Sequence, residues 1–278
     1  MLEDKYRMNL MGELKSILLC TDCTDYSLAA ATEAINFARA CGTSLTVMHV
    51  IEPSRGSKAD NKINMAQAHM DEIRDLAVGQ NVECKIVIDQ AADVHKAIVD
   101  ESKKIRADII IMGKHGRSVF ERLLMGSVTY KVIAHALCKV LVVPKGAEIK
   151  GENILLAVDG SKFSDSAEAE AMNMAAACPF VKKFLVLHAY PHRDRKKEAD
   201  TLLGEVQARA QGKGLTPEPL AVEDEPYKAI INASFERSTD IIIMGTHGRT
   251  GITKLIIGST AERVISLSRC AVLVTRTL

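Results

Sequence analysis

Two glycine-rich segments carry the residues whose types and spacing suggest chemistry. Each follows an apolar run, reads Gly-x-x-Gly, and reaches Gly-Ser after nine further residues. Glycine lets a backbone adopt positive φ or approach a phosphate oxygen with no side chain between them. Gly-Ser is expected to open a helix, whose unpaired N–H groups and dipole attract an anion. The predicted phosphate-binding positions are Gly113, Gly116, Gly126 and Ser127 in the first segment and Gly245, Gly248, Gly258 and Ser259 in the second.

A plainer interpretation is that these glycines only end strands and cap helices, which is the commoner role of a single glycine after a strand. The duplication argues against it. Both copies have identical spacing, and both follow a run expected to be a buried strand whose carboxyl end faces the ligand side of a parallel sheet. Phosphate binding is therefore the favoured interpretation.

The segments belong to an internal repeat. Residues 108–143 align with residues 240–275 without a gap, and half of the aligned positions are identical. Upstream, SILLCTDCTDYS from Ser16 corresponds to NILLAVDGSKFS from Asn153. The chain is therefore a duplication, with the same element order in each half.

Short β-branched runs alternate with longer amphipathic segments, which predicts βαβ crossovers and parallel sheets. We expect an α/β fold of two tandem doubly wound, Rossmann-like domains, 1–147 and 148–278, each a five-stranded sheet of order 3-2-1-4-5. Pro217 and Pro219 place the third strand of the second half at an edge. The predicted strands are 17–21, 45–50, 82–88, 109–112 and 140–143, then 154–158, 184–189, 218–222, 241–244 and 272–275.

Charge and hydropathy exclude several classes of function. The 36 Lys and Arg residues balance 35 Asp and Glu, leaving a net charge of +1 without a basic region for nucleic acid or anionic lipid. The first residues show no apolar stretch of signal-peptide length. No apolar run reaches the roughly 18–20 residues of a membrane span. We therefore expect a soluble, cytoplasmic protein, and apolar settings for several of its seven cysteines fit a reducing compartment.

The glycine pattern resembles the Gly-x2-Gly-x9-Gly-Ser signature of ATP-binding universal stress proteins, and the resemblance covers the chain after residue 14. In that family an acidic residue after the first strand meets adenosine, a backbone group after the second meets adenine, and the loop holds ribose and phosphates. The resemblance implies these roles for Asp22 and Asp159, for Val50 and Ala189, and for Ser127, Val128, Thr129, Ser259 and Thr260.

Two points leave alternatives open at these positions. Ala261 replaces Thr129 in the second half, which removes a hydroxyl and predicts a second site that binds no more tightly than the first. Either aspartate could instead be a turn or helix-start acid.

Histidine and arginine inside the loops are secondary candidates for phosphate contact. They are His115 and Arg117 in the first half and His247 and Arg249 in the second. A turn-shaping or solvent-exposed role competes with phosphate contact. His49 and His188 are interpreted as satisfied strand-end histidines without chemistry.

Cys20 and Cys23 form a Cys-x-x-Cys at a strand-to-helix junction, where a redox pair could lie. Their counterparts Ala157 and Gly160 show that the framework works without thiols. Zinc would need further ligands at suitable spacing, so neither a redox pair nor a metal site is predicted.

The leading hypothesis is a stress-response or regulatory protein that binds ATP, ADP or AMP, with or without Mg²⁺. Little or no turnover is expected, because no water-positioning base or Gly-Lys-Ser/Thr ending accompanies the loops. A weak ATPase or phosphotransferase is one alternative, and an interaction scaffold with structural nucleotide is another. We also predict that the halves pair pseudo-symmetrically through strands 140–143 and 272–275, with further homodimerisation open.

Overall fold

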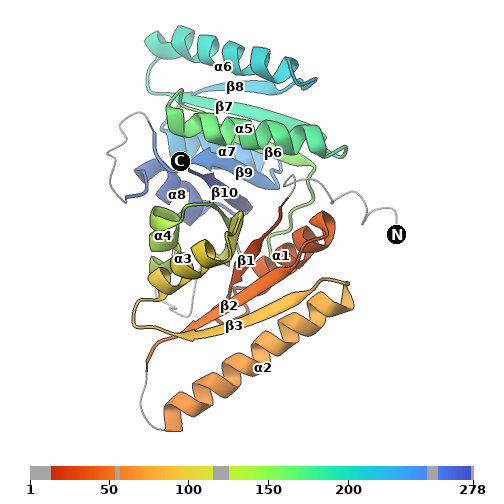
Figure 1. Cartoon of the computed structure of the whole chain (residues 1–278). Coiled ribbons are helices and arrows are strands. Elements are labelled where there is room, and N and C mark those ends of the chain that lie inside the picture. The colour runs from red at the N-terminus through yellow and green to blue at the C-terminus, as the bar shows by residue number, and fades with distance from the viewer. Residues whose placement is uncertain (1–13, 54–56, 115–124, 249–255, 277–278) are drawn as a thin grey trace. The chain divides into compact units, whose positions relative to one another are not determined.

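The computed structural model describes residues 14–53, 57–114, 125–248 and 256–276, without the side chains of 57–60 (Figure 1). These residues form two compact units, 14–146 and 147–276. Each unit is an α/β structure of alternating strands and helices.

In the first unit, every strand pairing is parallel and the order is β3-β2-β1-β4-β5. Central strand β1 pairs with β2 through Ile17 and Leu45 and with β4 through Ile17 and Ile109. The elements are β1 (Ile17–Cys20), α1 (Leu28–Cys41), β2 (Leu45–Ile51), α2 (Ser57–Gly79), β3 (Cys84–Gln90), α3 (Val94–Lys104), β4 (Ile109–Gly113), α4 (Ser127–His135) and β5 (Lys139–Val143).

The second unit repeats this topology with the order β8-β7-β6-β9-β10, again parallel throughout. The prediction of two tandem doubly wound sheets of order 3-2-1-4-5 is confirmed. The elements are β6 (Asn153–Ala157), α5 (Lys162–Ala177), β7 (Lys183–Tyr190), the 3-10 turn η4 (Arg193–Arg195), α6 (Lys196–Gln211), β8 (Glu218–Glu223), α7 (Pro226–Glu236), β9 (Ile241–Gly245), α8 (Ser259–Leu267) and β10 (Ala271–Thr275).

The central strands of each sheet are apolar on both faces, so helices cover both faces of the sheet. Every residue of β9 is buried, and β6 is buried from Ile154 onward. In the second unit α5 packs on β6 and β9, α6 packs on β7 and β8, and α7 packs on β7 and α8. Strand β8 is half exposed and contains Pro219, in agreement with the predicted edge position.

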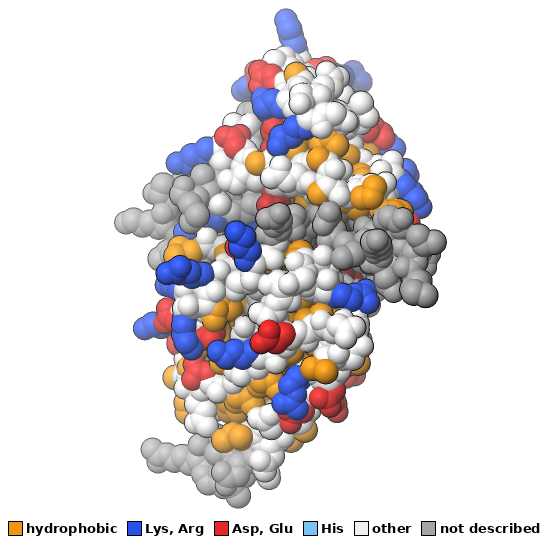
Figure 2. Space-filling view, turned by 45° about the vertical axis from the view of Figure 1, so that its right-hand side comes forward, with side chains coloured by type: hydrophobic (Ala, Val, Ile, Leu, Met, Phe, Trp, Pro, Cys, Tyr) orange, Lys and Arg blue, Asp and Glu red, His pale blue; other side chains and the backbone are white. Residues whose placement is uncertain are grey.

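The described surface is mixed in charge. On the face shown in Figure 2, Lys and Arg side chains are interspersed with Asp and Glu. No helix in the described part of the chain combines the length and the apolar character needed to cross a membrane.

Candidate functional site

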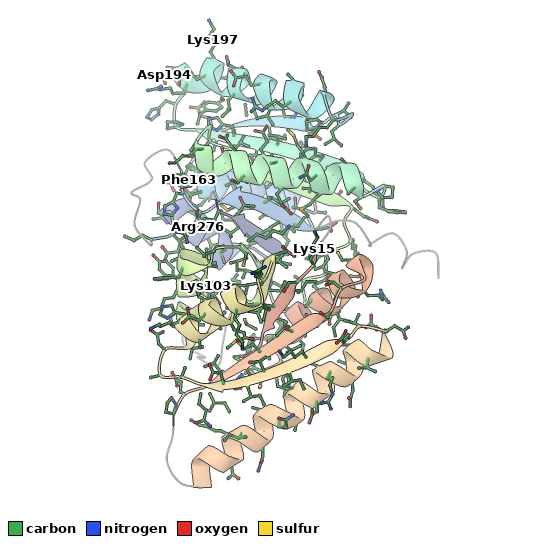
Figure 3. The ribbon with its side chains drawn as sticks, in the orientation of Figure 1. Lys15, Lys103, Phe163, Asp194, Lys197 and Arg276 are labelled. Atoms are coloured by element: carbon green, nitrogen blue, oxygen red, sulfur yellow. The ribbon has the colours of Figure 1, made fainter. Side chains whose placement is uncertain are left out.

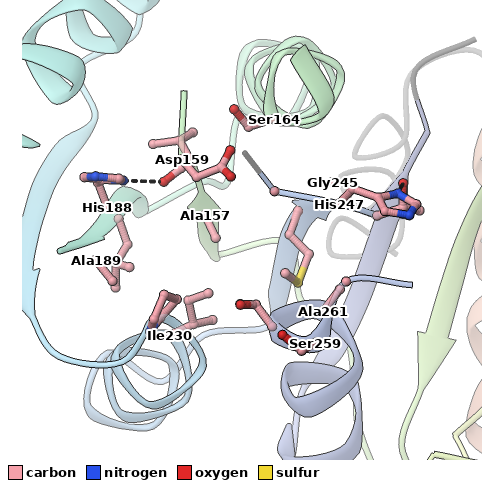
Figure 4. Close-up of a pocket in the computed structure, with 18 residues that line it drawn as sticks. Ala157, Asp159, Ser164, His188, Ala189, Ile230, Gly245, His247, Ser259 and Ala261 are labelled. Carbon is pink, nitrogen blue, oxygen red and sulfur yellow. Dashed lines mark hydrogen bonds between the residues drawn. The ribbon is translucent and has the colours of Figure 1, made fainter. Parts of the chain in front are cut away.

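A cavity of about 160 Å³ in the second unit brings the predicted residues together (Figure 4). It lies at the carboxyl ends of β6, β7 and β9 and at the start of α8. Ligands of parallel α/β sheets bind at this end of the strands. The predicted residues that line it are Asp159, Ala189, Gly245, His247, Gly248, Gly258, Ser259 and Thr260. Arg249 lies outside the described residues.

Gly245 ends β9 where helix α5 crosses it. A Cβ at this position would stand 2.5 Å from the carbonyl oxygen of Phe163, a residue of the first turn of α5 that is labelled in Figure 3. Such a contact with backbone forces a shift of strand or helix. Glycine is therefore required by close packing of α5 on β9.

Of the two reasons given for glycine, positive φ or a close approach, the described glycines of the second loop do not show the first. Gly245, Gly248 and Gly258 all lack it, and Gly258 is extended at φ −60° and ψ 142° as the N-cap of α8. Close approach, rather than a left-handed backbone, explains Gly245 and Gly248.

Gly248 lies against the carboxylate of Asp159. A Cβ on Gly248 would stand 2.7 Å from Asp159 Oδ2. The other oxygen, Oδ1, accepts a hydrogen bond from the backbone N–H of Ser161 at 3.0 Å. Asp159 thus bonds within its turn, as the alternative role of a turn acid predicts, and in Figure 4 its carboxylate also faces the cavity.

The amino end of α8 faces the same cavity through Ser259 and Thr260. Gly258 caps the helix without a side-chain hydrogen bond, so the first N–H groups are left for another acceptor. Two backbone hydrogen bonds hold this helix start in place. Gly258 N–H donates to the carbonyl of Thr246 at 2.9 Å, and Thr246 N–H donates to the carbonyl of Thr275 at 3.1 Å. A helix start held in this way can accept an anion.

His188 lines the cavity, and its side chain links β7 to the residue that follows β6. Its Nδ1 donates to the carbonyl of Val158 at 2.8 Å, because a carbonyl oxygen can only accept. His49 makes the same contact with the carbonyl of Thr21 at 2.8 Å. Both histidines are buried, which agrees with the prediction of satisfied strand-end residues.

His247 lies beside the end of β9 (Figure 4). Its Nδ1 is 3.0 Å from the hydroxyl of Thr246, and its ring centroid is 5.1 Å from that of Phe163. Its Nε2 is buried and has no hydrogen-bond partner among the described residues. The Thr246 hydroxyl and the Phe163 ring therefore fix the imidazole.

The first unit repeats the scaffold with different side chains. Asp22 Oδ1 accepts from the backbone N–H and the hydroxyl of Thr24, at 3.2 and 2.7 Å. Gly113 ends β4, and Gly126 is the extended N-cap of α4. The helix then begins with Ser127 and Val128.

Two further predicted positions of the first unit differ in burial and bonding. Thr129 is buried, and its hydroxyl donates to the carbonyl of Gly113 at 3.3 Å. Val50 lies one residue before the end of β2. His115, Gly116 and Arg117 lie outside the described residues.

Sequence reasoning missed part of the cavity lining. Pro226 and Ile230 come from α7, and Met244 and Thr246 flank Gly245. The residues that flank the glycine could have been found from the strand end. Those of α7 could not, because no motif marks the face that this helix presents.

The thiols of Cys20 and Cys138 are poorly suited to chemistry. Burial raises the pKa of the Cys20 thiol far above its usual range and raises that of Cys138 to about 11. A thiol with a raised pKa is a poor nucleophile and metal ligand. Within the described ranges, no group of three or more His, Cys, Asp or Glu side chains could hold a metal ion.

Comparison with known proteins agrees with this architecture. The model of the universal stress protein family matches residues 13–144 and 151–276. A universal stress protein of Methanocaldococcus jannaschii is 31% identical over 141 residues, which cover 47% of this chain and 82% of that protein. One of Synechocystis is 24% identical over 292 residues, covering 95% of this chain and 100% of that protein.

Other relatives are matched over less of their length. The match to a universal stress protein of Mycobacterium tuberculosis is 27% identical over 187 residues and spans 62% of that protein. Among solved structures, a universal stress protein from Archaeoglobus fulgidus has a TM-score of 0.72 at 22% identity, covering 94% of this chain and 98% of that one, which shows the same fold. With both halves matched by the family model, the chain belongs to the universal stress protein family.

Proposed function

We propose that this protein binds an adenine nucleotide in each half and acts as a regulatory or stress-response protein. The observation that carries the proposal is the cavity of the second unit. Every predicted contact residue of that half that the structure describes lines it. Those matching positions of the first unit that the structure describes stand on the corresponding strand ends and helix start.

The cavity lining combines apolar surface with hydrogen-bond donors. Ala189, Ile230 and Met244 provide apolar surface for a base, and Ser259, Thr260 and the start of α8 provide donors for phosphate. Asp159 also lines the cavity, and its carboxylate can only accept, so it suits the hydroxyls of a ribose. We propose ATP, ADP or AMP as the ligand, with or without Mg²⁺.

Binding with little or no turnover is the proposed mode. The phosphate end offers hydroxyls and N–H groups, which hold phosphate oxygens but do not activate water. Asp159 is the only carboxylate among the described lining residues, and it bonds to its own turn. A weak ATPase or phosphotransferase remains the competing proposal, and a turnover assay on the full chain separates the two.

Isothermal titration calorimetry of the full chain with ATP, ADP and AMP tests the proposal. We expect binding by the wild type and a loss of about tenfold or more at the second half in Asp159→Ala, since a hydrogen bond to a charged group contributes about 1.5–3 kcal/mol. Glu198→Ala, at an exposed residue in the first turn of α6, is the control and should bind as the wild type does. Absence of adenine-nucleotide binding by the wild type would refute the proposal.

The pairing of the two halves through residues 140–143 and 272–275, and any further homodimer, stay predictions from the sequence. Cysteine cross-linking between the two strands tests the pairing, and light scattering tests the homodimer.

A further inference from the structure

We propose that Thr246 is a positioning residue, which fixes the tautomer of His247 so that Nε2–H donates a hydrogen bond to the nucleotide phosphate in the second half. This inference rests on the proposed function and assigns a recognition device within that site.

The proton on the ring is assigned from the buried hydroxyl of Thr246. Thr246 is 4% exposed, and its Oγ1 lies 3.0 Å from His247 Nδ1. Within the described part of the chain this hydroxyl makes no second hydrogen bond. If Nδ1–H donated to the hydroxyl, both the hydroxyl hydrogen and the Nε2 lone pair would be left unpaired, whereas donation by the hydroxyl to Nδ1 leaves only Nε2–H unpaired, so the hydroxyl donates to Nδ1. The neutral imidazole then carries its hydrogen on Nε2.

The resulting Nε2–H donor lacks a protein acceptor. Nε2 is buried and finds no hydrogen-bond partner among the described residues, whereas His247 borders the cavity next to Gly248. The Phe163 ring, tilted 42° to the imidazole, packs beside it. A fixed, buried donor beside an anion site is satisfied when an acceptor-only group such as phosphate enters.

The tautomer decides whether His247 attracts or repels phosphate. With hydrogen on Nδ1 instead, Nε2 would offer a lone pair, and two acceptors cannot bond. Asp159 is the only formally charged side chain among the described lining residues, so neutral donors matter for phosphate here.

The repeat places a different side chain at the position of Thr246 in the first half. Lys114 occupies the position of Thr246 in the first half, and it too is buried, at 7% exposure. The backbone is conserved, since Gly126 N–H donates to the carbonyl of Lys114 at 3.1 Å as Gly258 does to Thr246. The first half therefore carries a charged ammonium where the second carries a neutral hydroxyl.

Nitrogen-15 NMR of the full chain labelled at histidine tests the proposal, with His247→Gln to assign the His247 signals. Free wild type should show the Nε2–H tautomer. Titration with AMP and with adenosine, followed on His247, reports the affinity of the second half alone. We expect Thr246→Val to weaken AMP by about tenfold and adenosine by less than about twofold, and Thr246→Ser to restore AMP binding.

Three results would overturn the proposal. They are an Nδ1–H tautomer in the free wild type, wild-type AMP affinity in Thr246→Val, and equal weakening of AMP and adenosine, which would indicate a structural role. If neither ligand perturbs the wild type, the proposed function fails as well, and that result is distinct from a failure confined to the Thr246 variant.

Discussion

The two halves keep the same backbone devices and differ in the side chains around their glycine loops. Each half has an aspartate in a turn after its first strand, a histidine bonded to the carbonyl before that aspartate, and an extended glycine N-cap. The loop of the first half begins with buried Lys114 and that of the second with buried Thr246. The difference indicates that duplication preserved the backbone of the proposed nucleotide site while the side chains around its loop diverged.

The helix starts differ as well. Thr129 donates to the carbonyl of Gly113 at 3.3 Å, whereas Ala261 at the matching place has no hydroxyl. Glu262 lies in the first turn of α8, and the first turn of α4 has no acid. A carboxylate at a helix start competes with an anion for the same dipole. The absence of an acid from the first turn of α4 favours phosphate binding in the first half. The Thr129 hydroxyl is expected to add to this by turning its single hydrogen from the Gly113 carbonyl to a phosphate oxygen.

The largest expected effect is on the scaffold that the halves share. Gly245→Ala places a Cβ 2.5 Å from the Phe163 carbonyl oxygen, so α5 must move from β9. We expect a loss of about 3 kcal/mol in the free energy of unfolding, at the upper end for overpacking. Urea denaturation measures it.

Gly204→Ala is the matched control, because Gly204 lies within α6 with nothing within 4 Å of its added Cβ. It should be neutral or stabilise the protein by about 0.5–1 kcal/mol. Equal stability of the two variants would show that the contact with Phe163 is unimportant.

Gly248→Ala should separate binding from stability. Its Cβ would stand 2.7 Å from Asp159 Oδ2, the end of a side chain that can move without unfolding the unit. We expect nucleotide affinity at the second half to fall by about tenfold, or about 1.4 kcal/mol, with little change in unfolding. Calorimetry with ATP measures the change. Unchanged affinity would mean that the position of Asp159 does not matter for the ligand.

The hydroxyl difference between the halves predicts a smaller effect. Ala261→Thr adds to the second half the hydroxyl that Thr129 supplies in the first, and one neutral hydrogen bond contributes about 0.5–1.5 kcal/mol. We expect up to about tenfold tighter binding at the second half, and a similar loss at the first half in Thr129→Ala. A wild-type second site that binds ten times more tightly than the first would contradict this account.

The smallest expected effect is on the pH dependence of stability, and it concerns Asp240, which directly precedes β9 at the end of the sheet away from the cavity. Burial raises the pKa of Asp240 above its usual range, although its Oδ2 accepts from the backbone N–H groups of Glu152 and Asn153 at 2.7 and 2.9 Å. Because the folded pKa exceeds the unfolded one, folding favours the protonated form. This contribution to stability is gained as pH falls through the folded pKa and is lost as pH rises.

Asp240→Asn should remove that part of the pH dependence. Urea unfolding of both proteins between pH 3 and pH 7 checks it, since roughly this range brackets the ordinary carboxyl pKa of about 4. An unchanged difference in stability between variant and wild type across the range would contradict the assignment.

The fold and much of the site were predictable because hydrophobic periodicity and the repeated motif can be read from residues that are close in sequence. Asp159 and Ser259 stand directly at strand and helix ends, which the repeated motif marks. Other features depend on which elements meet in three dimensions. The need for glycine at Gly245 comes from helix α5, and Ile230 reaches the cavity through the packing of α7. Neither relation is encoded in the spacing of the loop.

Native mass spectrometry of the full chain with ATP tests the central claim most directly. The account predicts that two adenine nucleotides bind per chain, one in each half, and that Gly248→Ala binds one at a concentration where the wild type binds two. A wild-type chain that binds no adenine nucleotide, or a Gly248→Ala chain that still binds two with wild-type affinity, would contradict it.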